Sequence, residues 1–224
     1  MSAKYEFVPG DTITIAPGRT LKRIRALATI AVAGVAPGNL GGYVESETNL
    51  AQVSGNARVY GNAQVYGNAQ VYGNAQVYGD ARVYGNARVY GNARVYGDAR
   101  VYGDARVYGN AQVYGNAQVC GDAQVYGDAW VYGNAWVCGD AQVYGDGLIF
   151  WASKVGSENG TLTVYNTKDN TLQVTRGCFV GSVDEFLEAS ERKHDDDTHL
   201  EYRLLIEIAH SRITRARAKL EADQ

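Results

Sequence analysis

Small or apolar residues alternate with polar or aromatic ones in a six-residue pattern through the centre of the chain. From Gly55 to Asp146 the unit is G-N/D-A-x-V-Y, with valine at every sixth position from Val53 to Val143 and Ile149 in phase. The alternation in A-x-V-Y predicts a short strand with one buried face. Glycine followed by asparagine or aspartate tolerates positive φ, which predicts a sharp corner between strands.

Short strands that repeat without any inversion of phase predict a solenoid rather than hairpins. We expect a mainly β fold containing a left-handed β-helix from about Val53 to about Ile149. Each coil would take three strands and roughly 18 residues, coils would stack at about 4.8 Å, and the segment would hold about five coils. Valine would fill the interior, with alanine inward near the corners. A pentapeptide solenoid repeats at about five residues and a propeller at about 40, so the period of six argues against both.

Stacked coils predict columns of equivalent residues. Two tyrosine columns are expected at Tyr60, Tyr78, Tyr96, Tyr114, Tyr132 and at Tyr72, Tyr90, Tyr108, Tyr126, Tyr144. In the third, Tyr66, Tyr84 and Tyr102 continue into Cys120 and Cys138, whose Cα atoms would lie about 5 Å apart, within reach of a disulfide. The chain has three cysteines and shows no signal-peptide pattern, so two free thiols in a reducing compartment are the expected state.

The flanking segments are expected to cover the open ends of the solenoid, whose strand edges would otherwise pair with other chains. We interpret 1–50 as an N-terminal β cap, 51–149 as the solenoid, 150–181 as a β-hairpin end cap and 182–224 as a helical tail. Cap strands are predicted at 4–8, 12–15, 21–32, 148–155 and 161–174, with a turn at 167–170.

Two helices are predicted in the tail. Ser182 and Glu185 form a capping-box pattern for a helix that reaches about Lys193. A second helix over 198–222 has an apolar seam of Tyr202, Ile206, Ala209, Ile213, Ala216 and Leu220, widened by Leu204, Leu205 and Ile208. This seam can pair with a second copy of itself, or pack against the solenoid or the first helix, and the spacing leaves both open.

The repeats differ from one another mainly at the outward-facing x position of the unit G-N/D-A-x-V-Y. It is glutamine on either side of five consecutive arginines and tryptophan near the end. Arginine and tyrosine are enriched at interface hot spots, and arginine binds phosphate bidentately. The candidate binding surface is therefore Arg82, Arg88, Arg94, Arg100, Arg106, Tyr84, Tyr90, Tyr96, Tyr102, Tyr108, Trp130 and Trp136. The alternative is a solvated ladder in which Asp80, Asp98 and Asp104 neutralise part of the arginine belt.

Charge restricts the partners of this surface. The formal net charge is −3, and residues 53–149 hold six arginines and seven aspartates with no lysine or glutamate. That balance disfavours nucleic acid and membrane surfaces as partners. No apolar stretch is long enough to span a membrane, and the absence of a signal-peptide pattern predicts a cytoplasmic protein.

No catalytic or metal-binding constellation stands out. His194, His199 and His210 are the three histidines, and all lie in the helical tail. The segment 194–199 is rich in potential ligands, but we interpret it as a linker whose acids favour a helix N-terminus. No cofactor is therefore expected.

Two resemblances accompany these predictions. The repeat over 53–149 resembles the hexapeptide acyltransferase superfamily, which implies a histidine general base and a projecting acyl-donor loop, and the repeat here has neither. The segments LKRIRA at 21–26, GNLGGYVE at 38–45, NLAQ at 49–52, the V-Y-G-N-A run, GCF at 177–179 and EF at 185–186 resemble uncharacterised prophage and enterobacterial hexapeptide-repeat proteins labelled putative transferases. That second likeness implies a phage or prophage setting.

We therefore expect a non-enzymatic binding or scaffold protein. It would act as a homo-oligomer in the cytoplasm of a host cell, where it engages a host protein or sequesters a small anionic, nucleotide-like immune signal. One alternative is a hexapeptide-type acyltransferase with an unrecognised site. Another is a structural spacer of a virion or assembly.

Overall fold

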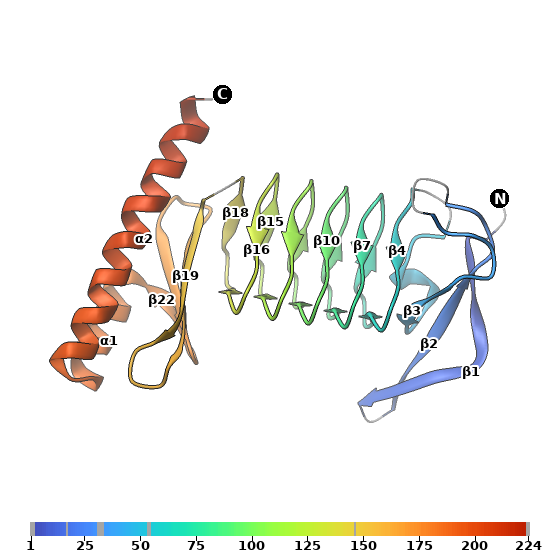
Figure 1. The fold of residues 1–224 in the computed structure, drawn as a ribbon, viewed down its shortest axis with the longest axis horizontal. Coiled ribbons are helices and arrows are strands. Elements are labelled where there is room, and N and C mark those ends of the chain that lie inside the picture. The colour runs from blue at the N-terminus through green and yellow to red at the C-terminus, as the bar shows by residue number, and fades with distance from the viewer. Residues whose placement is uncertain (1–2, 17, 31–33, 53–54, 146, 223–224) are drawn as a thin grey trace.

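The solenoid lies between two antiparallel sheets, and two helices cover the outer side of the C-terminal sheet (Figure 1). A computed structural model describes residues 3–16, 18–30, 34–52, 55–145 and 147–222. Two predicted boundaries, Val32 and Val53, lie outside these ranges. The chain order and the mainly β architecture agree with the fold expected from the sequence.

Each hexapeptide forms one short strand, and strands 18 residues apart pair in parallel, as Arg94 does with Gln112. The strands group into three flat faces, called here faces A, C and D. Face A holds β5, β8, β11, β14 and β17, face C holds β6, β9, β12, β15 and β18, and face D holds β4, β7, β10, β13 and β16. Their bounds are β4 Arg58–Val59, β5 Gln64–Val65, β6 Gln70–Val71, β7 Gln76–Val77, β8 Arg82–Val83, β9 Arg88–Val89, β10 Arg94–Val95, β11 Arg100–Val101, β12 Arg106–Val107, β13 Gln112–Val113, β14 Gln118–Val119, β15 Gln124–Tyr126, β16 Trp130–Val131, β17 Trp136–Val137 and β18 Gln142–Tyr144.

The stack is slightly taller than the sequence predicted. Strand β3 (Leu40–Val44) adds a rung to face A before β5, and Leu50 bridges Val71 on face C. Together with the repeat strands these rungs make about six turns, where about five were expected.

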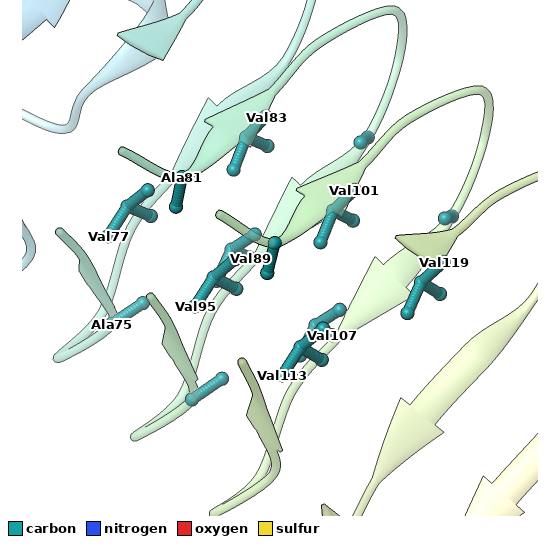
Figure 2. Packing of buried hydrophobic residues seen from close by; sticks show 14 of the residues in the cluster. Ala75, Val77, Ala81, Val83, Val89, Val95, Val101, Val107, Val113 and Val119 are labelled. Atoms are coloured by element: carbon teal, nitrogen blue, oxygen red, sulfur yellow. The ribbon is translucent and has the colours of Figure 1, made fainter. Parts of the chain in front are cut away.

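The interior is filled by valine and alanine alone through most of its length, as Figure 2 shows for the central coils. Valines 65–143 and alanines 63–141 of the repeat are at most 1% exposed. Each buried valine contributes on the order of 1.5–3 kcal/mol, so stability is built up coil by coil.

The corners depend on glycine. The repeat glycines from Gly55 to Gly145 have φ between 62° and 72°, the left-handed region that other residues rarely adopt. They also lie close to the next coil: a Cβ added to Gly103 would stand 3.0 Å from the Gly121 nitrogen. A corner residue therefore needs both the backbone freedom and the small size of glycine.

Replacing Gly103 with alanine should destabilise the solenoid more than left-handed strain alone explains. Gly177 is the matched control, because it also has positive φ (58°) but a Cβ added there would meet nothing within 4 Å. We expect Gly177→Ala to lose about 1–2 kcal/mol in chemical unfolding, and Gly103→Ala to lose more because a neighbouring backbone must move. Equal losses would contradict the crowding argument.

The N-terminal cap is continuous with one face of the solenoid. Strands β1 (Tyr5–Ala16), β2 (Arg19–Ala26) and β3 form an antiparallel sheet, and β3 pairs in parallel with β5. The two strands predicted at 4–8 and 12–15 are one strand with a register shift. The strand predicted to reach Val32 ends at Ala26, where the chain turns and Gly38 N–H donates to the Ala26 carbonyl. A short 3-10 helix, η2 (Glu47–Asn49), leads into the first coil.

The C-terminal cap is a four-stranded antiparallel sheet of β19 (Ile149–Val155), β20 (Gly160–Asn166), β21 (Leu172–Arg176) and β22 (Phe179–Ser182). The predicted turn at 167–170 is confirmed by a hydrogen bond from Asn170 N–H to the Thr167 carbonyl. This turn divides the predicted strand at 161–174 into β20 and β21, and a tight turn through Gly177, which has positive φ, returns the chain into a further strand, β22.

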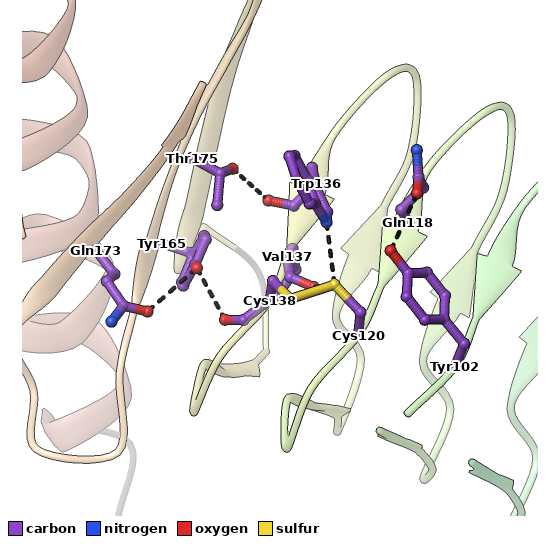
Figure 3. Close-up of a disulfide and its surroundings, with 9 residues drawn as sticks. All are labelled: Tyr102, Gln118, Cys120, Trp136, Val137, Cys138, Tyr165, Gln173 and Thr175. Atoms are coloured by element: carbon purple, nitrogen blue, oxygen red, sulfur yellow. Dashed lines mark hydrogen bonds between the residues drawn. A yellow bond between two sulfur atoms is a disulfide. The ribbon is translucent and has the colours of Figure 1, made fainter. Parts of the chain in front are cut away.

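This sheet meets the last coil through side chains and through one backbone bridge, between Ala141 and Thr167. Thr163 and Thr175 flank the last rung of face A: Trp136 N–H donates to Thr163 Oγ1 at 3.1 Å, and Thr175 Oγ1 donates to the Trp136 carbonyl at 2.6 Å. Tyr165 is buried against the valine core, and its hydroxyl donates to the Cys138 carbonyl at 2.8 Å (Figure 3). These side chains therefore hydrogen-bond the last rung of face A, at the edge that a further coil would have occupied.

The hydroxyl of Tyr165 gives the cap a specific pH dependence. Burial raises the pKa of Tyr165 to about 12, above the value of about 10 for an unfolded chain. As pH rises above 10, the unfolded chain loses this proton first, so the stabilisation is complete below about pH 10 and is lost between about 10 and 12. The melting temperature of Tyr165→Phe should therefore fall less than that of the unaltered protein across this window. Parallel melting curves would contradict this assignment.

Two helices complete the chain, α1 (Val183–Lys193) and α2 (Asp196–Ala222). The predicted capping box is present, with Ser182 and Glu185 bonded to each other's backbone. Strand β20 alternates between two cores: Leu162 and Val164 face the helices, whereas Tyr165 joins the solenoid core. The seam of α2 is buried within this second core at Tyr202, Ile206, Ala209 and Ile213, so these residues pack inside the chain, whereas Leu204 and Ile208 are each 49% exposed.

Candidate functional site

The arginine belt is wound around the solenoid, because successive repeats lie on successive faces. Arg82 and Arg100 lie on face A, Arg88 and Arg106 on face C, and Arg94 on face D. All five side chains are exposed. A partner that meets one flat face therefore contacts one or two of these arginines and not the whole set.

On faces A and C the arginines form stacked pairs. Arg82 is in register with Arg100, and Arg88 with Arg106, on neighbouring rungs. On face D, Arg94 lies between Gln76 and Gln112. Like charges placed directly opposite each other on a sheet repel. Each stacked pair is thus a local site of positive potential.

The expected neutralisation by aspartates does not take place through ion pairs. Among the described residues, no carboxylate lies within 4.0 Å of any of the five guanidinium groups. The reason is geometric, since the aspartates occupy corners while the arginines stand on the flat faces. Asp80 and Asp104 instead accept hydrogen bonds from the corner amides of Asn62 and Asn86.

The predicted tyrosine columns are confirmed. Within the ten-ring set of faces C and D, neighbouring rings such as Tyr78 and Tyr96 stack at a centroid distance of 4.8 Å and an angle of 2°. On face A, Tyr84 stacks between Tyr66 and Tyr102. The rings cover one another, so Tyr84, Tyr90, Tyr96, Tyr102 and Tyr108 are half-buried and not exposed as the sequence suggested.

Whether a tyrosine hydroxyl makes a hydrogen bond depends on which residue occupies the x position of the next rung. Tyr96, Tyr102 and Tyr108 donate to the side-chain carbonyls of Gln112, Gln118 and Gln124 at 3.1 to 3.3 Å.

Tyr84 and Tyr90 meet arginine in the equivalent place, and in the described part of the chain their hydroxyls have no hydrogen-bond partner. Burial raises the pKa of Tyr84, so its hydroxyl stays protonated at neutral pH and can donate. The arginine pairs are therefore accompanied by hydroxyl groups that can donate to a ligand.

The two tryptophans lie on different faces. Trp130, on face D, is 52% exposed, next to Tyr132 at 39%. Trp136, on face A, is half-buried, and its Nε1 donates to Cys120 Sγ at 3.0 Å. They do not form one aromatic surface.

Cys120 and Cys138 are joined by a disulfide that links neighbouring rungs of face A, with Cα atoms 4.6 Å apart (Figure 3). The expectation of two free thiols is thus corrected. The compartment decides whether such bonds persist, whereas the column brings the two side chains together whatever the compartment. Cys178 is free and exposed.

Thiol titration of the denatured protein should therefore find one reactive cysteine without reductant and three after reduction. Removal of the cross-link in the double variant Cys120→Ser/Cys138→Ser should cost roughly 3 kcal/mol of unfolding free energy, as expected for a loop of this length. Cys178→Ser is the control and should leave stability unchanged. Three reactive thiols in unreduced protein purified under oxidising conditions would contradict the bond.

Two of the three histidines contact serine hydroxyl groups. His194 and His199 lie within hydrogen-bond distance of the Ser157 and Ser190 hydroxyls. Asp195 accepts from Thr198 N–H at 2.8 Å at the start of α2, and hydrogen bonds from the Thr198 side chain and backbone lower the pKa of the carboxyl. The segment 194–199 thus fits the interpretation as a helix-opening linker. Across the described ranges, no group of three or more His, Cys, Asp or Glu side chains is placed to hold a metal ion.

Comparison with protein families identifies the repeat. Residues 51–67, 75–91, 87–103, 99–115, 105–123 and 123–139 match the model of the YdcK Beta solenoid repeat. These matches fall within the central part of the chain and cover less than half of its length. No curated protein sequence matches the chain. In the described residues, no helix is both long and apolar enough to cross a membrane.

Proposed function

We propose that this protein is a non-enzymatic scaffold that binds a small anionic ligand on the arginine-bearing faces of its solenoid. The observation that carries this proposal is the stacking of Arg82 on Arg100 and of Arg88 on Arg106 with no carboxylate within ion-pair distance among the described residues. An anion placed between two such side chains would relieve their repulsion. Electrostatics therefore favours the binding of an anion to the free protein.

Phosphate groups fit these pairs best. The planar guanidinium fork binds phosphate oxygens with two parallel hydrogen bonds, and two forks on neighbouring rungs can hold one phosphate or two adjacent ones. Tyr84 and Tyr90 add hydroxyl donors beside the pairs. A nucleotide would combine such phosphates with a base able to pack on the adjoining tyrosine edges. The resemblance to prophage proteins makes nucleotide signals of the host the first class to examine.

The surroundings favour a short ligand over a polymer. The solenoid holds six arginines and seven aspartates, so no face offers the long positive stripe that a nucleic acid requires. A host protein with an acidic patch is the second class of partner within the same proposal. The acyltransferase alternative lacks a histidine on any coil, and the spacer alternative gives the arginine pairs no role.

Titration calorimetry against linear and cyclic mono- and dinucleotides tests the proposal. At least one ligand should bind, and Arg82→Gln/Arg100→Gln or Arg88→Gln/Arg106→Gln should weaken its binding at least tenfold, consistent with the loss of more than about 1.4 kcal/mol. Glutamine already occupies equivalent positions at Gln64, Gln70, Gln118 and Gln124, so both variants should fold normally.

Arg203→Gln is the matched control, because Arg203 is exposed on α2 away from the faces. It should leave binding unchanged. An absence of heat with every nucleotide would remove the nucleotide-binding proposal. Binding that neither double variant weakens would place the site elsewhere and overturn the role of the arginine pairs.

A further inference from the structure

Face D begins differently from the other two faces. Before the first repeat strand, face A is extended by β3 and face C by the bridge from Leu50 to Val71. On face D the sheet ends at β4, and in the described ranges no strand precedes it. In the described part of the chain, the cap strand β3 lies beside β4, at the junction on the N-terminal side of Figure 1.

A hollow of about 400 Å³ lies at this junction. One wall comes from the first coil through Ala57, Arg58, Val59 and Tyr60, and the opposite wall from the cap. The cap side chains in the wall include Ile24, Ile30, Leu40 and Leu50. The size and the largely apolar lining match those of small-molecule sites in proteins.

One apolar side chain at the hollow is largely exposed. Leu40 is 58% exposed, more than any other large hydrophobic residue in the described part of the chain. The neighbouring Ile24 and Leu50 are at most 5% exposed. Leu40 would lose contact with water if an apolar ligand filled the hollow, which would favour binding.

The charged residues at the hollow are both cationic. Lys4 and Arg58 contribute to the lining, and no carboxylate does so among the described residues. Lys4 Nζ donates to the Gly55 carbonyl at 3.4 Å, and the Arg58 guanidinium lies 5.3 Å from the centre of the Tyr60 ring. Burial lowers the pKa of Lys4, so a nearby anion would stabilise its charged form.

We propose that this hollow binds a small amphiphilic carboxylate, with its hydrocarbon chain against Ile24, Leu40 and Leu50 and its carboxylate beside Lys4 and Arg58. The apolar lining leaves few groups to hydrogen-bond a sugar or a base, so a nucleotide fits poorly there. A ligand with one anionic head group and one apolar chain matches both the cationic and the apolar side chains of the lining. This site is separate from the stacked arginine pairs and does not depend on their function.

Titration calorimetry with decanoate, kept below its micelle concentration, tests the site. Decanoate should bind to one site per chain. Decanol shares the chain without the charge, and acetate shares the charge without the chain, so each should bind at least tenfold more weakly. The double variant Lys4→Gln/Arg58→Gln should reduce decanoate affinity at least tenfold and leave decanol unaffected. Leu40→Ser should weaken both.

Arg94→Gln is the matched control, since Arg94 holds the same column of face D two rungs from Arg58. It should leave decanoate binding unchanged, while folding of every variant is checked by circular dichroism. Absence of decanoate binding to the unaltered protein would overturn the proposal. So would binding that is as tight in Lys4→Gln/Arg58→Gln and in Leu40→Ser as in the unaltered protein.

Discussion

Each residue of the solenoid lies on its equivalent 18 residues later, and the rest of the structure depends on this registered stacking. Its effect differs with the side chain that is repeated. Valines stacked on valines exclude water, and tyrosines stacked on tyrosines cover each other's faces. Corner asparagines form an amide ladder that runs from Asn56 through Asn74, Asn92 and Asn110 to Asp128. Charged residues are the exception, because a repeated charge meets its like.

The arginine pairs are the positions where stacking is least favourable, so they are also the positions where a bound anion would stabilise the structure most. Arginine at Arg82 and Arg100 could be glutamine without loss to the core, as it is elsewhere in the same column. Their presence is not explained by the packing of the coil. This is why the proposed ligand surface is assigned to the arginine pairs and not to the tyrosine columns, which are largely occupied with one another.

A uniform repeat contains no feature that ends the stack of coils, so each end of the solenoid is covered by a flanking segment, and the two segments do this in different ways. At the N-terminus, β3 converts an antiparallel sheet into the first parallel rung of face A. At the C-terminus, Thr163, Thr175 and Tyr165 hydrogen-bond the last rung of face A with side-chain groups. The N-terminal solution extends faces A and C but leaves face D without a preceding rung in the described residues, and the apolar hollow lies there.

The sequence by itself determined the solenoid, its three-strand coil, its tyrosine columns, the capping box at Ser182 and the seam of α2. These features arise from contacts at a constant separation along the chain, so periodicity encodes them directly. Only the tertiary structure decided how the caps meet the coils: the strand β22, the burial of the α2 seam against the sheet, and the hollow beside β4. Each of these depends on contacts between segments that share no period, and the position of one relative to the other is set by packing, which no local pattern specifies.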